Sequence, residues 1–312
     1  MVGASYLLNP FTLLTCLGRP TSVFGNLFIL LSISKACSGA AVTSIFALAL
    51  ASYTSLYPLL LLPPLVLLCY DKLESRQASK TKNSLTSFAV RQTASLGLSI
   101  GILLVLSYAL TGSWSFVSSV YSTRLLLPDL TPNVGLWWYF FIEIFDSFRS
   151  FFVGVFWLHL ASYSPALTIR LREQPLAVLV LLCGIFAIFQ PYANVGDAGM
   201  WIGMLSLYGH VFERKCNPST GPQLCRHADT YATVTRYTFP ALSALLYTTL
   251  LGPAFYYLWI YAGSGNANFF YAITLVWSLA LSVIVADLLY AILRDEWEVE
   301  RPEMKGKEVS RI

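Results

Sequence analysis

The chain has 312 residues, of which 56% are hydrophobic and 12% are charged, and its mean hydropathy is +0.63. A soluble domain carries about a quarter charged residues, so this composition excludes an ordinary soluble protein and predicts a polytopic membrane protein. The net charge of +4 comes from basic residues in short loops, which indicates membrane orientation and argues against nucleic-acid binding.

Apolar segments of a length suited to membrane helices recur along the whole chain. A transmembrane helix needs about 20 apolar residues to cross a hydrocarbon core of roughly 30 Å. The first segments are a short one at 21–33 and a long one at 40–70, which Pro58, Pro63 and Pro64 turn into either one bent span or two half-helices. Further spans are predicted at 94–117, 136–160, 239–261 and 269–293, with two shorter apolar stretches at 175–190 and 197–211.

Together these segments predict an all-α bundle of about eight transmembrane helices, some of them short or broken, over residues 1–293. Residues 294–312 carry mixed charge without an apolar period. We expect them to form a cytosolic, solvated and partly disordered tail.

The loops between the apolar segments alternate in charge. Lysine and arginine gather in the tail and in the loops at 71–93, 161–175 and 213–238, whereas the loops at 118–135, 191–197 and 262–268 are almost free of them. Cytoplasmic loops carry the excess of basic residues in membrane proteins. The pattern therefore predicts a cytosolic C-terminus and places the charge-poor loops on the opposite side of the membrane, where we expect the functional side chains.

Ionisable residues inside the predicted spans need an explanation. Glu143, Asp146 and Arg149 lie three residues apart within 136–160, so neighbours are in reach of each other on a helix. Because intramembrane charges are costly and usually pair, an Asp146–Arg149 pair is the preferred explanation, and Glu143 is the better candidate for contacting a headgroup or partner. Asp287 has no second carboxylate nearby in the sequence for acid–base chemistry, so a buried hydrogen bond is preferred over contact with a partner subunit.

The loop at 262–268 presents two amides at a predicted membrane edge. A glycine-rich turn around Ser264 precedes Asn266 and Asn268. Amides donate and accept hydrogen bonds at once, which suits sugar hydroxyls and phosphate oxygens. Asparagine is also a common cap of a following helix, and the sequence leaves these two explanations equal.

The sequence contains no motif for catalysis. It has no Walker loop, no nucleophile elbow, no zinc-protease motif and no histidine cluster. Asp129 and Asp197 come from different charge-poor loops, so they do not form the acidic pair that glycosyl transfer would use. Cys216 and Cys225 share a loop with His227, but without the tight spacing of zinc sites. We therefore expect no cofactor, no metal and no enzymatic activity in the chain itself.

Five stretches of the sequence carry a resemblance to a known family. They are YLLNP at 6–10, SLYP at 55–58, PDLTPNVGLWWYFFIE at 128–143, VGD at 195–197 and LWIYAGSGNANFFYA at 258–272. These stretches resemble the PIG-U subunit of GPI transamidase, and the similarity covers nearly the whole chain, from residue 6 to about residue 294.

The resemblance implies a multi-pass protein of the endoplasmic reticulum membrane. It would belong to a five-component complex that removes a C-terminal signal from proproteins and joins the new carboxyl end to a GPI lipid. A cysteine protease-like subunit would perform the chemistry, while this subunit would help to recognise the lipid, the attachment signal or both. Its fold would be related to the GT-C-like membrane fold of the lipid-linked-sugar mannosyltransferases. Family members carry roughly a further third of chain upstream, so we expect an N-terminal portion to be missing.

The leading hypothesis is therefore a non-catalytic membrane subunit that contacts the other transamidase subunits, the GPI glycolipid, the proprotein attachment signal and membrane lipids. The alternative is a mannosyltransferase of GPI or lipid-linked glycan synthesis, although the early lumenal loop that holds the acidic residues of such enzymes is absent from this sequence. A fatty-acid elongase would need clustered histidines, and no inverted repeat supports a transporter. The residues predicted to hold the GPI headgroup at the lumenal edge are Asn266, Asn268, Ser264, Asp129, Asn133 and Glu143.

Overall fold

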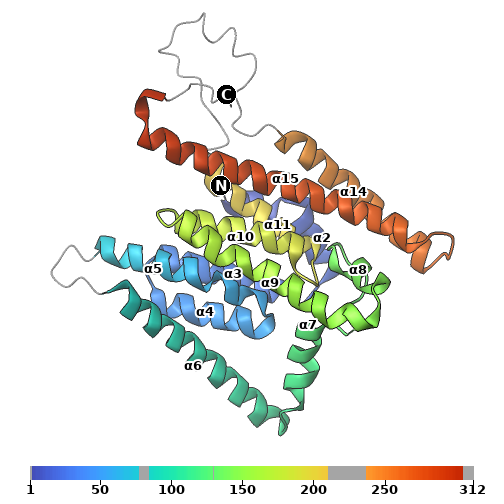
Figure 1. Ribbon diagram of the computed structural model, residues 1–312, viewed down its shortest axis with the longest axis horizontal. Coiled ribbons are helices and arrows are strands. Elements are labelled where there is room, and N and C mark those ends of the chain that lie inside the picture. The colour runs from blue at the N-terminus through green and yellow to red at the C-terminus, as the bar shows by residue number, and fades with distance from the viewer. Residues whose placement is uncertain (1, 77–83, 129, 210–236, 305–312) are drawn as a thin grey trace, which may run out of the picture. The chain divides into compact units, whose positions relative to one another are not determined.

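The computed structural model describes residues 2–76, 84–128, 130–209 and 237–304, and within these ranges all regular structure is helical. The chain divides into two compact units (Figure 1). The larger unit holds residues 3–203, and the smaller one is formed mainly by the residues from Met204 onwards. Each unit is described by itself.

The larger unit contains a closely packed helical hairpin. Helices α3 (Ser22–Cys37) and α4 (Ala41–Thr54) pack closely against each other. Ser32 Oγ donates to the Ser44 carbonyl at 2.9 Å, and Ser44 Oγ donates to the Ser32 carbonyl at 2.8 Å. Small side chains let two apolar helices approach until such bonds form, so this pair fixes the register of the hairpin. Gly39 has a φ of 71° in the connecting turn, a conformation that glycine adopts without strain.

The proline-rich segment after this hairpin forms two further helices, and a turn connects the first of them to α4. α4 ends at Ser55, whose backbone is extended, and a short 3₁₀ helix η1 (Tyr57–Leu61) follows. α5 (Leu62–Arg76) then begins with two prolines, which the first turn tolerates because its N–H groups have no partner inside the helix. Of the two predicted arrangements for 40–70, the divided one is found.

The next helix, α6 (Leu85–Thr111), packs on α4 and only 6% of its most apolar window is buried. It begins earlier than the predicted span at 94–117 and ends where Gly112 adopts a φ of 68°. A π-helical turn, η2 (Val117–Ser122), and the short α7 (Thr123–Leu126) follow.

The predicted span at 136–160 is wrong in its boundaries. The structure has a short α8 (Trp137–Glu143), an extended break at Ile144 and Phe145, and then α9 (Asp146–Arg170). α9 therefore fills most of the predicted loop at 161–175. The break lies between Glu143 and Asp146, two charged residues inside the predicted span.

The core of the larger unit surrounds α10 (Pro175–Phe189), which packs against α5 and α9 and is buried along almost its whole length. α11 (Val195–Leu205) lies against it, and a Cβ added at Gly184 would come within 2.5 Å of the Trp201 ring. The short helices α1 (Val2–Leu7) and α2 (Pro10–Gly18) pack on α11: the Asn9 side chain caps α2 and also donates to the Gly199 carbonyl at 3.3 Å.

The smaller unit contains the long helices α14 (Thr238–Ile260) and α15 (Ala267–Glu300), which pack against each other. Buried Asp287 accepts hydrogen bonds from the Tyr237 N–H at 3.0 Å and the Thr238 hydroxyl at 3.2 Å, which confirms the preferred structural role for this carboxylate. α15 continues past 293, where an Arg294–Glu298 ion pair of 2.7 Å joins successive turns. The short turns η3 (Ser206–Tyr208) and η4 (Pro302–Met304) flank these helices in the chain.

Four helices of the described ranges are long and apolar enough to cross a membrane, namely α6, α9, α14 and α15. Helices α3, α4 and α10 are apolar but shorter. The predicted all-α membrane protein is thus supported, while the total of about eight spans and the relation to the mannosyltransferase fold stay predictions.

Candidate functional site

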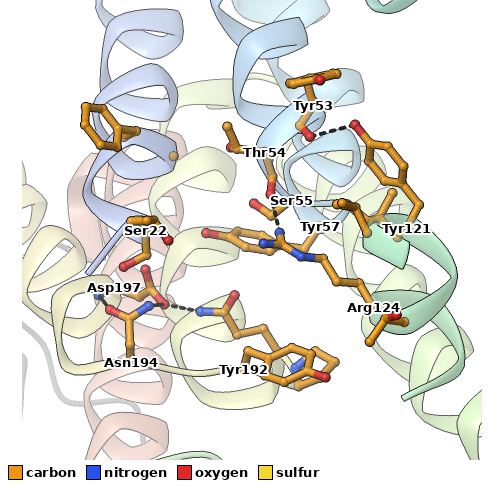
Figure 2. A pocket seen from close by; sticks show the side chains of 18 of the residues that line it. Ser22, Tyr53, Thr54, Ser55, Tyr57, Tyr121, Arg124, Tyr192, Asn194 and Asp197 are labelled. Atoms are coloured by element: carbon orange, nitrogen blue, oxygen red, sulfur yellow. Dashed lines mark hydrogen bonds between the residues drawn. The ribbon is translucent and has the colours of Figure 1, made fainter. Parts of the chain in front are cut away.

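A cavity of about 910 Å³ opens within the larger unit (Figure 2). Its walls come from five stretches that are distant in the sequence: the start of α3, the end of α4 with the turn into η1, the π-helical turn with α7, Trp157 of α9, and the loop between α10 and α11. π-helical turns are rare and are often found at functional sites. The polar and charged groups discussed below are Ser22, Tyr53, Ser55, Tyr57, Tyr121, Arg124, Gln190, Asn194 and Asp197.

Tyrosines supply much of the wall on the α4 side. The Tyr121 hydroxyl donates to the Tyr53 carbonyl at 2.8 Å, and the two rings meet edge to face with centroids 6.3 Å apart. Tyr53 in turn is hydrogen-bonded through its hydroxyl to Ser107 of α6. Burial raises the pKa of Tyr121 to about 12, so its hydroxyl keeps its proton. These side chains offer apolar ring faces with polar tips, a combination suited to amphipathic ligands.

Arg124 brings a positive charge into this wall. It is half-buried at the start of α7, and its guanidinium donates to the Thr54 carbonyl at the end of α4. Its charge opposes the upward shift in the pKa of Tyr121. Among the described residues no carboxylate forms an ion pair with Arg124. Its remaining N–H donors are therefore available for an anion.

Asp197 brings a negative charge to the opposite side of the cavity. It lies in the first turn of α11 and is 3% exposed. Its Oδ2 accepts from Asn194 Nδ2 at 2.6 Å and from the Gln190 amide. Burial raises the pKa of Asp197 to about 6, and the amides of Asn26, Asn194 and Gln190 oppose that shift.

The second oxygen of this carboxylate has no partner. Asp197 Oδ1 is fully buried without a hydrogen bond in the described part of the chain, and so are Asn26 Oδ1 and Ser22 Oγ. Asn26 is nonetheless close enough to this carboxylate for its side chain to act as a hydrogen-bond donor that lowers the pKa of Asp197, and it does not line the cavity. Ser22 and Asn26 are one turn apart on α3 and therefore share a face. A buried polar atom without a partner costs about 1–3 kcal/mol, and these atoms have almost no surface that a ligand in the cavity could contact.

Asn133, a predicted headgroup ligand, instead holds two loops together. Its Nδ2 donates to the Pro191 carbonyl at 3.1 Å and to the Thr131 carbonyl at 3.0 Å, while its Oδ1 accepts from the Gly135 N–H at 2.7 Å. All its polar atoms are engaged, and it does not line the cavity. Through Pro191, however, it positions the loop that carries Gln190, Asn194 and Asp197.

The three ionisable residues of the predicted span at 136–160 are arranged differently from the prediction. Glu143 is exposed at the end of α8 and does not line the cavity. Within the described ranges Asp146 and Arg149 form no ion pair, so that prediction is wrong. Arg149 donates instead to the Phe141 carbonyl at 2.9 Å, to the Pro128 carbonyl at 3.2 Å and to the Leu127 carbonyl. The end of α8 has carbonyls without helical partners, and the arginine satisfies one of them across the break.

The other predicted site residues lie elsewhere. Asn266 accepts a hydrogen bond from the Phe269 N–H at 3.3 Å and caps α15, so the capping explanation is found in the structure. Ser264 and Asn268 are exposed at the same end of this hairpin, in the smaller unit. Asp129 lies outside the described residues. No contact within the described part of the chain therefore brings the predicted headgroup residues together into one site.

The sequence did contain a signal for the cavity, although it was not used. Arg124 is the sole basic residue of its charge-poor loop, and Asp197 is the acidic residue of another. Arg124 and Asp197 both line this cavity. The orphan atoms of Ser22 and Asn26 had no sequence signal. No group of three or more metal-ligating side chains gathers within the described ranges, and Cys216, Cys225 and His227 lie outside them.

Comparison with known proteins relates the whole chain to one family. The profile described as GPI transamidase subunit PIG-U matches residues 1–277. The human GPI-anchor transamidase component PIGU is 36% identical over 299 residues, which is 95% of this chain and 63% of the human protein. The GPI transamidase component GAB1 of Saccharomyces cerevisiae is 36% identical over 312 residues, covering 98% of this chain and 70% of the yeast protein. The mouse relative PIGU is 35% identical over 297 residues, 94% of this chain and 63% of the mouse protein. The chain thus spans slightly less than two-thirds of the length of its mammalian relatives, and it belongs to the PIG-U family of GPI transamidase subunits.

Proposed function

We propose that this chain is a non-catalytic membrane subunit of GPI transamidase and that the cavity of its larger unit binds the headgroup of the GPI glycolipid during anchor attachment. The relatives' names place them in GPI transamidase. The observation that carries the binding role is the cavity itself: about 910 Å³, at the upper end of the range for small-molecule pockets, with aromatic walls and a few convergent polar groups.

The location of the cavity supports a lumenal headgroup. Two of the three charge-poor loops, 118–135 and 191–197, both contribute residues to its lining. The positive-inside rule assigns these loops to the non-cytosolic side, which is the endoplasmic reticulum lumen if the protein resides there. The cytosolic C-terminus belongs to the same proposal.

The chemistry of the lining favours the glycolipid over the apolar part of a proprotein signal. Tyrosine hydroxyls, amides, a guanidinium and a carboxylate suit sugars and phosphates, whereas an apolar peptide would leave them unpaired. Among the described lining residues Asp197 is the only carboxylate, and two of its donors already come from the protein. We therefore assign binding and orientation to this subunit and leave the chemistry to the complex's cysteine protease-like subunit.

A blocking substitution tests this role. Ser119 lines the cavity, and its neighbour Ser118 does not; both are exposed, and both hydroxyls donate to the Ser115 carbonyl. Ser119→Trp would place an indole ring in the cavity and obstruct part of it, and Ser118→Trp is the matched control. Each substitution is introduced into the gene in the organism that encodes it. The other subunits are then co-purified with the variant chain to check that the complex assembles.

With Ser119→Trp we expect an assembled complex, several-fold less anchored reporter protein, and accumulation of uncleaved reporter together with complete GPI lipid. Ser118→Trp should behave like the unsubstituted chain. Normal anchoring with Ser119→Trp would refute the binding role of the cavity. Accumulation of under-mannosylated lipid would instead identify a mannosyltransferase.

A further inference from the structure

We propose that residues 113–126, which include η2 and α7, form a movable wall of the cavity and open to admit its ligand. Tyr121 and Arg124 hold this wall closed against the end of α4 (Figure 2). The entry role rests on the proposed function, because it concerns the lipid that the cavity would bind. The movement itself does not depend on that function, and the two are measured separately below.

The movable wall lacks the buried side chains that hold other parts of the larger unit in place. All residues from 113 to 126 are described, and none of them is buried. In the loop opposite, Gln190 and Asp197 are only 4% and 3% exposed, and Asn133 ties that loop down through the Pro191 carbonyl. Segments with few buried contacts open at a lower free energy than the core does. The movable wall should therefore open more readily than the loop opposite.

The residues that bound the movable wall both have a left-handed backbone conformation. Gly112 has a φ of 68°, and nothing beyond its immediate neighbours lies within 4 Å of a Cβ placed there. Leu127 has a φ of 51°, is fully buried, and accepts a hydrogen bond from Arg149 through its carbonyl. Hinge motions are absorbed by a few residues in loops or at the ends of elements. Gly112 has the freedom to act as the hinge, while Leu127 anchors the other end.

Side-chain hydrogen bonds to backbone carbonyls hold the movable wall closed. The Tyr121 hydroxyl donates to the Tyr53 carbonyl at 2.8 Å, and the Arg124 guanidinium donates to the Thr54 carbonyl. Both carbonyls belong to the last turn of α4, where the helix itself supplies no donors. Trp157 of α9 also donates to a carbonyl of α7 at 2.9 Å. Because water can replace each of these bonds when the wall moves, each favours the closed state only by its net contribution.

Hydrogen exchange tests the movement, measured on the complete complex in lipid nanodiscs without added GPI lipid. Tyr121→Phe removes one of the bonds to α4 and keeps the ring, and Arg124→Met removes the other. The net contribution of an ordinary hydrogen bond corresponds to about a fivefold change in an opening equilibrium, and that of a charged one to about tenfold or more. We expect amide exchange at 117–126 to quicken by about these factors, while exchange in α10 stays unchanged.

Matched variants separate these bonds from general effects of the substitutions. Tyr163→Phe also removes a tyrosine hydroxyl, which is hydrogen-bonded to His159 at 2.9 Å within α9 and lies outside the cavity lining. Arg172→Met removes an exposed arginine from the turn after α9. Both controls should leave exchange at 117–126 as in the unsubstituted chain. Equal exchange in Tyr121→Phe, Arg124→Met and their controls would refute the movable wall.

The rate of lipid capture tests the entry role. A photo-crosslinkable GPI lipid is added to the same complexes, and the initial rate of its crosslinking to this chain is recorded together with the final yield. If the lipid enters through the movable wall, its capture depends on the population of the open state. Tyr121→Phe should then raise the initial rate by about the same factor as the exchange, and Tyr163→Phe should leave it unchanged.

The outcomes keep this inference apart from the proposed function. Faster exchange without faster capture would show that the wall opens but is not the route of entry, which refutes the inference. Capture that Ser119→Trp leaves intact would refute the proposed function, and the exchange result would still decide whether the wall moves. If Arg124→Met does not assemble, Tyr121→Phe decides the question, because it removes a single hydroxyl.

Discussion

Arg149 gives the sharpest prediction about how the larger unit is held together. Its guanidinium crosses the break between α8 and α9 and donates to the carbonyls of Phe141, Pro128 and Leu127. Leu127 itself has a φ of 51°, so the arginine fixes a turn in an uncommon conformation as well as the end of α8. We predict that Arg149→Met, which keeps the aliphatic stem, destabilises both the turn at Leu127 and the end of α8.

The magnitude follows from the bonds lost. A hydrogen bond to a charged group contributes about 1.5–3 kcal/mol, and the guanidinium also lies 5.1 Å from the centroid of the Phe141 ring, a cation–π contact worth about 0.5–1 kcal/mol at an exposed site. Because Arg149 is only half-buried, water replaces part of this, and we expect a loss of about 2–3 kcal/mol. In a unit of this size that lowers the unfolding temperature by about 5–10 °C.

The assay is thermal unfolding of the purified complex in detergent, followed by tryptophan fluorescence. Trp137 and Trp138, which are fully buried at the start of α8, are two of the chain's eight tryptophans that contribute to this signal. Arg172→Met, which removes an exposed arginine from a loop, is the matched control. Equal unfolding temperatures for the two variants would show that the carbonyl contacts of Arg149 contribute nothing to stability.

Three further predictions concern other contacts. Asp287→Asn should destabilise the pairing of α14 with α15 by about 1–2 kcal/mol, because the bonds from the Tyr237 N–H and the Thr238 hydroxyl lose the negative charge of their acceptor; proteolysis at the start of α14 should quicken, and an unchanged rate would contradict this role. Gly184→Ala should cost about 1–3 kcal/mol, since the new Cβ would lie 2.5 Å from the Trp201 ring, and a normal unfolding temperature would show that the ring can move. Asn133→Ala should increase hydrogen exchange in the loop at 190–197, because it breaks the bond to that loop; unchanged exchange would mean that other contacts hold the loop.

Much of the helical architecture was predictable from local sequence. The hairpin formed by α14 and α15 was expected at 239–261 and 269–293, and it is found at Thr238–Ile260 and Ala267–Glu300. Long apolar runs fix such helices because every backbone group bonds within its own segment. For residues 40–70 the sequence left one bent span or two half-helices open, and the structure has the divided arrangement. Proline removes a helical hydrogen-bond donor, so the prolines after α4 account for the division.

The predicted binding residues stay a prediction, because a polar residue near a membrane edge has local structural uses as well as possible contacts with a ligand. Asn266 caps a helix and Asn133 joins two loops, and both use the same amide chemistry that suggested sugar recognition. Residue type alone could not distinguish these roles.

By itself the sequence determined the membrane class, the approximate positions of most long helices and the family, because hydropathy, proline placement and extended motifs are properties of neighbouring residues. Only the tertiary structure decided where α8 breaks from α9, that Arg149 binds carbonyls and not Asp146, and that Ser22, Arg124 and Asp197 line one cavity. The physical reason is that a hydrogen-bond partner distant in the sequence, or the lack of one for a buried atom, depends on how separate helices pack, and no local pattern encodes that.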